Sequence, residues 1–152
     1  MTDNTEKMTE EKAGELMDQG FHCSQCVFSY AAQRMGMDKS LALKLSAGLG
    51  GGCYHGDSCG AITAAALAIG MAYGFDQPNA TQEDQVLISN VKAMEARFQQ
   101  ENGALLCRHL LQGFDKADPA AVAPEGTYSQ CPQFCATACN ILDELLGEHY
   151  VK

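Results

Sequence analysis

Apolar residues recur at helical spacing along most of the chain, and no stretch alternates between apolar and polar residues as a β-strand would. The clearest stripe holds Leu87, Val91, Met94 and Phe98. Together with capping residues and glycine stops, such stripes predict seven helices. They run from Thr9 as cap to Gly20, Ser24 to Met35, Asp38 as cap to about Gly48, Ala61 to Tyr73, Thr81 to Gly103, Leu105 to Gln112, and Pro132 to Leu146.

Two of these helices have features that set their expected roles. Residues 61–73 are apolar nearly all round, which predicts a central helix. Thr81 and Asp84 resemble a capping box at the start of the longest helix. Residues 113–130 form the one long irregular segment, and we find no internal repeat. The chain is therefore predicted to be a single all-α domain, residues 1–152, with six or seven helices in one compact bundle.

The composition and charge of the chain limit the classes of binding partner and the cellular compartment that we expect. The chain has 152 residues, of which 46% are hydrophobic and 19% charged, as expected of an ordinary folded domain. Its formal net charge of −9 disfavours nucleic acid and anionic membrane surfaces as partners. The polar, acidic start MTDNTEKMTEEK lacks the features of a signal peptide, and the most apolar segment is too short to span a bilayer. We expect a cytoplasmic protein.

Eight cysteines in a reducing compartment indicate metal binding or redox chemistry more than structural disulfides. Cys23, Cys59, Cys107 and Cys131 each fall at or near the start of a predicted helix. The exposed N–H groups and positive dipole end of a helix start stabilise a thiolate or an anionic metal–sulfur group. These four thiols are the first candidates for a functional site.

The other four cysteines extend this set. Cys26 follows Cys23 by three residues, and Cys135 and Cys139 continue the helix face begun by Cys131. Cys53 lies in the glycine-rich stretch GLGGGCYHGDSCG. Two helices and a loop can thus present further thiols to the same region. Alternatively, Cys135 and Cys139 are packing residues of the apolar stripe, because cysteine is often a small buried hydrophobe.

Four cysteine segments, arriving in order, resemble a known family. They are GFHCSQC, GDSCGAITAAALAIG, LLCRHLLQ and CPQFCATACNILDELL. The chain is similar, over nearly its whole length, to the redox-active proteins named for the pattern C_GCAxxG_C_C. The family's cysteines fall on Cys23, Cys59, Cys107 and Cys131, and its CGAxxG motif begins at Cys59 but ends in Ala64 where the family has glycine.

The resemblance implies redox chemistry at cysteine. A similar domain occurs in split-Soret-type cytochromes, where it is associated with an iron–sulfur centre. Cys26 is followed by Val27 and no C-x-x-C-H occurs, so covalent c-type haem is not expected. Cys26, Cys53, Cys135 and Cys139 are additions to the family pattern.

Three hypotheses follow for the chemistry. In the first, Cys23, Cys59, Cys107 and Cys131 bind an iron–sulfur cluster for electron transfer with a redox partner protein, and the additional cysteines serve a second or enlarged cluster. In the second, paired cysteines such as Cys23 and Cys26 act as a thiol–disulfide oxidoreductase or redox sensor. In the third, four cysteines bind a structural zinc ion. No substrate site is identified, and a homodimer is a further expectation.

Overall fold

The computed structural model describes residues 6–112, 114 and 120–151, and within these ranges it contains helices and no strand beyond an isolated β-bridge between Ser58 and Leu106. The prediction of an all-α fold is confirmed. The described residues form seven α-helices: α1 (Glu10–Asp18), α2 (Cys23–Arg34), α3 (Lys39–Ser46), α4 (Gly60–Tyr73), α5 (Thr81–Asn102), α6 (Cys107–Leu110) and α7 (Cys131–Leu146).

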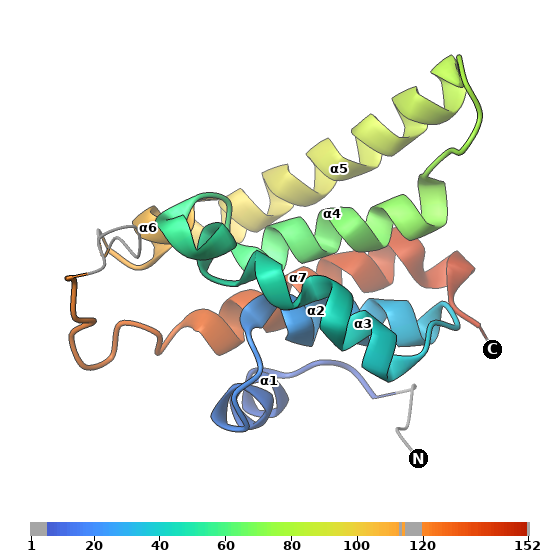
Figure 1. Ribbon diagram of the computed structural model, residues 1–152. Coiled ribbons are helices and arrows are strands. Elements are labelled where there is room, and N and C mark those ends of the chain that lie inside the picture. The colour runs from blue at the N-terminus through green and yellow to red at the C-terminus, as the bar shows by residue number, and fades with distance from the viewer. Residues whose placement is uncertain (1–5, 113, 115–119, 152) are drawn as a thin grey trace.

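Helices α2, α4 and α7 form the centre of the bundle, and each packs on the other two. Helix α3 lies against α2, and α1 packs across α2 and α7. Helix α5 packs against α4 and α7 with one end and leans away from the body toward its start (Figure 1). The central three helices all begin at the left-hand end of the molecule in this view, where α6 also lies.

Small residues let the central helices approach closely. On α4 the residues Ala61, Ala64, Ala65 and Ala68 are fully buried, and α4 packs against α2, α5 and α7. Larger side chains close the core around them, and the largest fully buried ones are Phe28, Phe98, Ile69, Met94, Ile141, Leu142 and Leu146. Ala64, which stands where the family has glycine, is therefore a buried core residue.

Several helix ends differ from the prediction. Thr81 is the first residue of α5 and its cap is Ala80, which makes no side-chain hydrogen bond, so the predicted capping box is wrong. Helix α6 has only four residues, because Leu111 already leaves the helical conformation. The predicted all-round burial of α4 is also incomplete, since Leu67 and Met71 are exposed. Thr9 and Asp38, by contrast, cap α1 and α3 as predicted, accepting from Lys12 N and Leu41 N.

No helix within the described ranges combines the length and apolarity that crossing a bilayer requires.

A polar cluster at the far end of α2 joins α2 to α7 and to the C-terminal segment. The Tyr30 hydroxyl donates to both oxygens of Asp143, at 2.9 and 2.8 Å, and the Tyr150 hydroxyl lies 3.1 Å from Asp143 Oδ1. Burial and the Asp143 carboxylate raise the pKa of both tyrosines well above the ordinary value of 10.0. The folded state therefore holds both hydroxyls in the protonated form.

This cluster predicts a loss of stability at alkaline pH. A raised folded-state pKa contributes stability that is present below about pH 10 and is lost as the pH rises further, because the unfolded chain then releases protons that the folded chain retains. The free energy of unfolding, measured in urea between about pH 8 and about pH 11, should fall less steeply in the Tyr30→Phe/Tyr150→Phe variant than in the wild type. Equal slopes would contradict the assignment.

Candidate redox site

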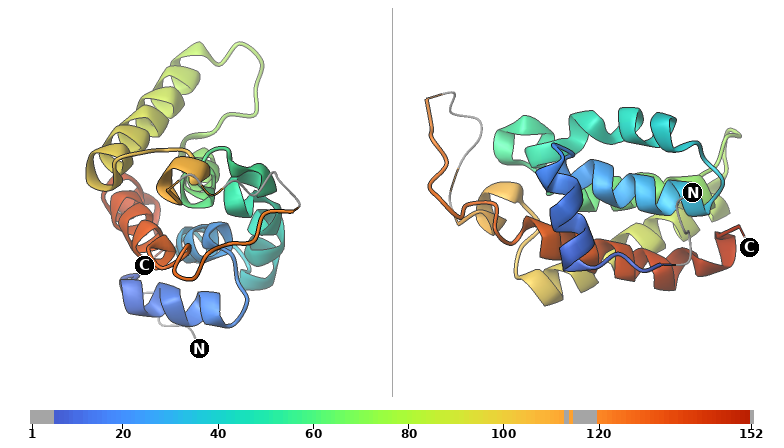
Figure 2. Two further views of the ribbon diagram at one scale, coloured as in Figure 1. Left: turned by 90° about the vertical axis from the view of Figure 1, so that its left-hand side faces the viewer. Right: turned by 90° about the horizontal axis from the view of Figure 1, so that it is seen from below.

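The four family cysteines meet at the end of the bundle where the central helices begin. Cys23, Cys107 and Cys131 are the first residues of α2, α6 and α7, and Cys59 is the residue immediately before α4. The left view of Figure 2 looks onto this end of the molecule. These positions confirm the prediction that the four cysteines lie at or near helix starts. The structure also brings them together, because all four line one cavity of about 50 Å³.

A short backbone pairing fixes two of these cysteines side by side. The Cys59 N–H donates to Leu105 O at 2.8 Å, and the Cys107 N–H donates to Asp57 O at 2.7 Å. Arg108 strengthens the same junction, with its guanidinium 3.3 Å from Gly56 O. Segments 57–59 and 105–107, far apart in the sequence, are thus joined at the cavity.

Gly60 makes room for the thiol of Cys23. A Cβ atom at Gly60 would lie 2.6 Å from Cys23 Sγ and 2.9 Å from Leu49 O, which is closer than atoms pack. The absence of a side chain therefore lets the Cys23 sulfur rest against the first turn of α4, beside Cys59. This is a physical reason for the glycine that follows Cys59 in the motif.

A left-handed turn forms another wall of the cavity. Gly51, Gly52, Cys53 and Tyr54 all have positive φ, between 56° and 64°. The non-glycine members are costly in this conformation, and such strain is found mostly at functional sites. Gly51 lines the cavity, whereas Cys53 is exposed and does not. The structure therefore leaves Cys53 outside the group of four.

The environment of Cys59 favours the neutral thiol. Its pKa is raised well above the ordinary value by a hydrogen bond with the Cys23 thiol, by burial and by the charge of Cys23, while the Ala61 N–H acts in the opposite direction. Cys107 adds to the rise. Several thiols in one buried place cannot all ionise unless a positive charge joins them, so a metal would have to displace their protons.

Cys26, Cys135 and Cys139 form a second group, buried between α2 and α7 and outside the cavity. Their side chains are at most 1% exposed. Cys135 is hydrogen-bonded to Cys26, and this bond, with burial, raises the pKa of the Cys135 thiol. Burial, followed by Asp143 and Cys26, likewise raises the pKa of Cys139, against the effect of Arg34. Cys135 Sγ lies 3.7 Å from the carbonyl oxygen of Cys23.

Some residues of the site carried no clear signal in the sequence. His22 lines the cavity next to Cys23, and its ring stacks edge-on against Tyr54 with centroids 5.4 Å apart. Met17, Phe134 and Tyr128 complete the apolar lining from α1, α7 and the segment before α7. His55 instead pairs with Asp57 at the surface, and His109 is exposed. Only the position of His22 beside a motif cysteine pointed to this cavity.

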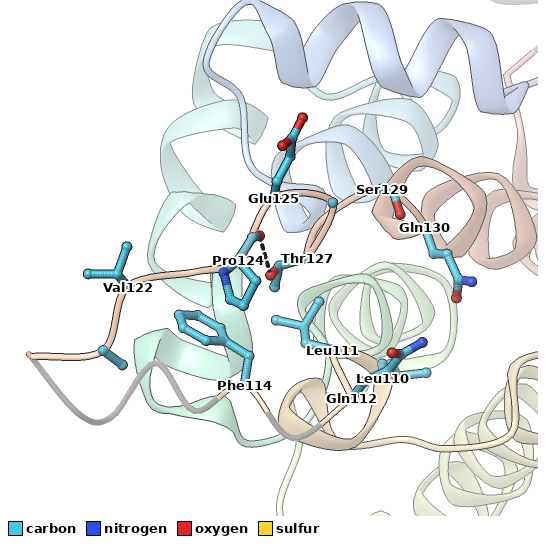
Figure 3. A pocket seen from close by; sticks show the side chains of 12 residues that line it. Leu110, Leu111, Gln112, Phe114, Val122, Pro124, Glu125, Thr127, Ser129 and Gln130 are labelled. Carbon is cyan, nitrogen blue, oxygen red and sulfur yellow. Dashed lines mark hydrogen bonds between the residues drawn. The ribbon is translucent and has the colours of Figure 1, made fainter.

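A larger cavity of about 500 Å³ lies beyond Leu110 and Leu111, which line both spaces. Figure 3 shows it between α6 and the segment leading to α7, with the Thr127 hydroxyl donating to Pro124 O at 2.6 Å. Its described lining has one carboxylate, Glu125, and no cysteine or histidine. The described lining of this larger cavity therefore offers no thiol for redox chemistry.

Within residues 6–112, 114 and 120–151, no three or more histidine, cysteine, aspartate or glutamate side chains are arranged so that they could hold a metal ion. The eight cysteines all belong to these ranges, and none of them is in a disulfide. The four cysteines thus line one cavity but are not grouped closely enough to hold a single metal ion.

These features identify the class of protein: an all-α bundle whose site is lined by four cysteines at or beside the first residues of its helices. Residues 21–145 match the family model described as "Putative redox-active protein (C_GCAxxG_C_C)", and the chain belongs to this family. The family and the cysteine content fit a redox role. No curated protein matches the chain, and no solved structure does.

Proposed function

We propose that the protein transfers electrons through an iron–sulfur cluster bound by Cys23, Cys59, Cys107 and Cys131, with partner proteins as electron donor and acceptor. The observation that carries the proposal is that these four thiols, from four separate segments, line one cavity. Clusters are usually held by four cysteine thiolates, so the donor set fits. When bound, the cluster supplies one-electron redox chemistry.

The shape of the cavity also fits a cluster. A space of about 50 Å³ has room for roughly three or four water molecules, hence for a small group of heavy atoms. In a four-iron cluster each of the four thiolates binds a separate iron, and in a two-iron cluster each iron takes two thiolates. Both arrangements require thiols that are spread around a space. The four cysteines here are placed in this way.

The surrounding residues are suited to holding an anionic group out of water. Cys59 and Cys107 are only 4% and 8% exposed, and Met17, Leu110 and Phe134 provide apolar walls. The starts of α2, α4 and α7 direct backbone N–H groups and the positive ends of helix dipoles toward the same end of the bundle. Burial and N–H groups are the features by which a protein tunes cluster potential.

The test is an absorption spectrum with iron, zinc and acid-labile sulfide analysis on protein purified without oxygen. We expect a brown protein with iron and sulfide in stoichiometric amounts. Zinc without sulfide would contradict the electron-transfer proposal and support a structural site instead. Iron without sulfide would contradict the cluster.

A second candidate function is a reversible disulfide between Cys23 and Cys59, and the observation that favours it is that Cys23 Sγ lies against Gly60, the residue that follows Cys59. In this case the protein would be a thiol–disulfide oxidoreductase or sensor. A colourless, metal-free protein that loses two thiols on mild oxidation, with Cys23 linked to Cys59, would decide for it. The C-x-x-C pair Cys23 and Cys26 is less favoured, because Cys26 is buried and does not line the cavity that Cys23 lines.

A further inference from the structure

A pocket among the first three helices lies apart from the cysteine cavity. It has a volume of about 200 Å³, and its lining comes from α1, α2, α3 and the segments before and after α1. It shares no residue with the cavity of Cys23, Cys59, Cys107 and Cys131. Sites for drug-sized ligands usually measure about 300–1,000 Å³, so this pocket suits a smaller molecule.

Arg34 places a buried positive charge in the wall of this pocket. It is 8% exposed, its guanidinium lies 3.4 Å from the centre of the Tyr30 ring, and it donates to Tyr30 O at 3.0 Å and to Glu6 O. These bonds leave N–H groups of the guanidinium for a further acceptor. Within the described ranges no carboxylate forms an ion pair with Arg34, and the nearby Asp143 accepts from Tyr30 and Tyr150 instead. A buried charge without a counter-charge is costly, so an anion in the pocket would supply the missing partner.

Two further polar groups of the lining have no partner in the part of the chain that the structure describes. Ser29 is 7% exposed and its hydroxyl makes no hydrogen bond there, and the exposed Lys39 makes no ion pair there. The other two charged residues of the lining, Lys12 and Glu6, pair with each other. The positive charges of Arg34 and Lys39 therefore remain without a carboxylate partner, in a chain with 19 acidic residues.

The pocket also has an apolar wall. It is formed by Met8 from the segment before α1, Leu16 from α1, Phe21 from the segment before α2 and Leu43 from α3. A ligand held by a charged group therefore has apolar surface against which the rest of its atoms can pack.

We propose that this pocket binds a small carboxylate with an apolar body, such as a short-chain fatty acid. The carboxylate accepts hydrogen bonds from the remaining N–H groups of Arg34 and from the Ser29 hydroxyl, and Lys39 adds electrostatic attraction at the edge of the pocket. A planar guanidinium matches a carboxylate and can bind both of its oxygens at once. The apolar body of the ligand displaces water from the apolar wall.

The test is a calorimetric titration of the whole chain, purified without oxygen, with hexanoate and separately with hexanol. We expect saturable binding of hexanoate and none of hexanol, which has the same carbon chain but no charge. Arg34→Gln should weaken hexanoate binding by at least about tenfold, as expected for hydrogen bonds to a charged group. Ser29→Ala should weaken it by about three- to tenfold, while the thermal unfolding temperature stays the same, because the hydroxyl has no partner in the described part of the protein.

Lys39→Gln and Lys44→Gln form a matched pair on α3. Both lysines are exposed and both changes remove one positive charge, but only Lys39 lines the pocket. We expect Lys39→Gln to weaken hexanoate binding by about two- to fivefold and Lys44→Gln to leave it unchanged, with thermal unfolding confirming that every variant folds. Absence of saturable hexanoate binding, equal binding of hexanol, equal losses in the two lysine variants, or tighter binding of inorganic phosphate than of hexanoate would overturn the proposal. Unchanged affinity in Ser29→Ala and Lys39→Gln would overturn it as well, even if Arg34→Gln failed to fold.

Discussion

Replacing Cys59 with serine is expected to abolish binding of iron and sulfide. Cys59 lines the cavity with the other three cysteines, and Cys23 and Cys107 both act to raise its pKa. It is also 4% exposed, so no solvent ligand can readily take its place. A serine hydroxyl is a far weaker ligand than a thiolate for a cluster. The measurement is the iron and sulfide content of the anaerobically purified variant, with its absorption spectrum.

The matched control for this prediction is Cys53→Ser. Cys53 is close to Cys59 in the sequence but exposed and outside the cavity. This variant should retain the iron, sulfide and colour of the wild type. Full retention of iron and sulfide by Cys59→Ser would remove Cys59 from the set of ligands, and equal losses in both variants would show that the cavity does not define the site.

Replacing Gly60 with alanine is the second change with a large expected effect. In an ordinary helix this exchange is stabilising, because glycine is a poor helix former. Here the new Cβ would lie 2.6 Å from Cys23 Sγ and 2.9 Å from a backbone oxygen, so the thiol and the first turn of α4 must move apart. We expect a loss of about 1–3 kcal/mol in the free energy of unfolding, which is the usual cost of overpacking, together with loss of the bound iron.

Gly70→Ala provides the control within the same helix. A Cβ at Gly70 would meet nothing within 4 Å, so the intrinsic helix preference should decide the result. We expect a gain of up to about 1 kcal/mol relative to glycine, with iron content unchanged. Urea unfolding of the two variants measures both effects. If the Gly60→Ala protein were as stable as Gly70→Ala and retained its iron, the close approach of the Cys23 sulfur to Gly60 would be contradicted.

The helices were predictable because their signals are local. A capping side chain or an apolar stripe involves residues only one or two helical turns apart. The structure confirms the caps Thr9 and Asp38, and it buries Met94 and Phe98 of the α5 stripe. The prediction of a capping box at Thr81 was wrong, although it also rested on local residue types. Its residues allow a cap, but the backbone enters the helix one residue earlier, with Ala80 in the cap position.

The grouping of the four motif cysteines was predictable only in part. Their positions at helix starts follow from the sequence, but the pairing of segments 57–59 and 105–107 depends on backbone hydrogen bonds between distant parts of the chain. The position of the Cys23 sulfur against Gly60 likewise depends on how α2 and α4 pack against each other. No periodicity encodes such contacts.

The division of the other cysteines shows the same limit. Spacing places Cys26 on one face with Cys23, and Cys135 on one face with Cys131. Rotation of the packed helices decides which thiols reach the cavity and which enter the interface between α2 and α7. In the structure Cys26 and Cys135 are buried in the core and do not line the cavity.

The central claim is that Cys23, Cys59, Cys107 and Cys131 bind one iron–sulfur cluster. A crystal structure of the anaerobically purified protein, with diffraction measured at the iron absorption edge, tests it most directly. The account predicts strong anomalous density in the cavity, bonded to the sulfur atoms of all four cysteines. A cavity without iron whose Cys23 and Cys59 sulfurs are joined in a disulfide, or iron bound by other cysteines, would contradict it.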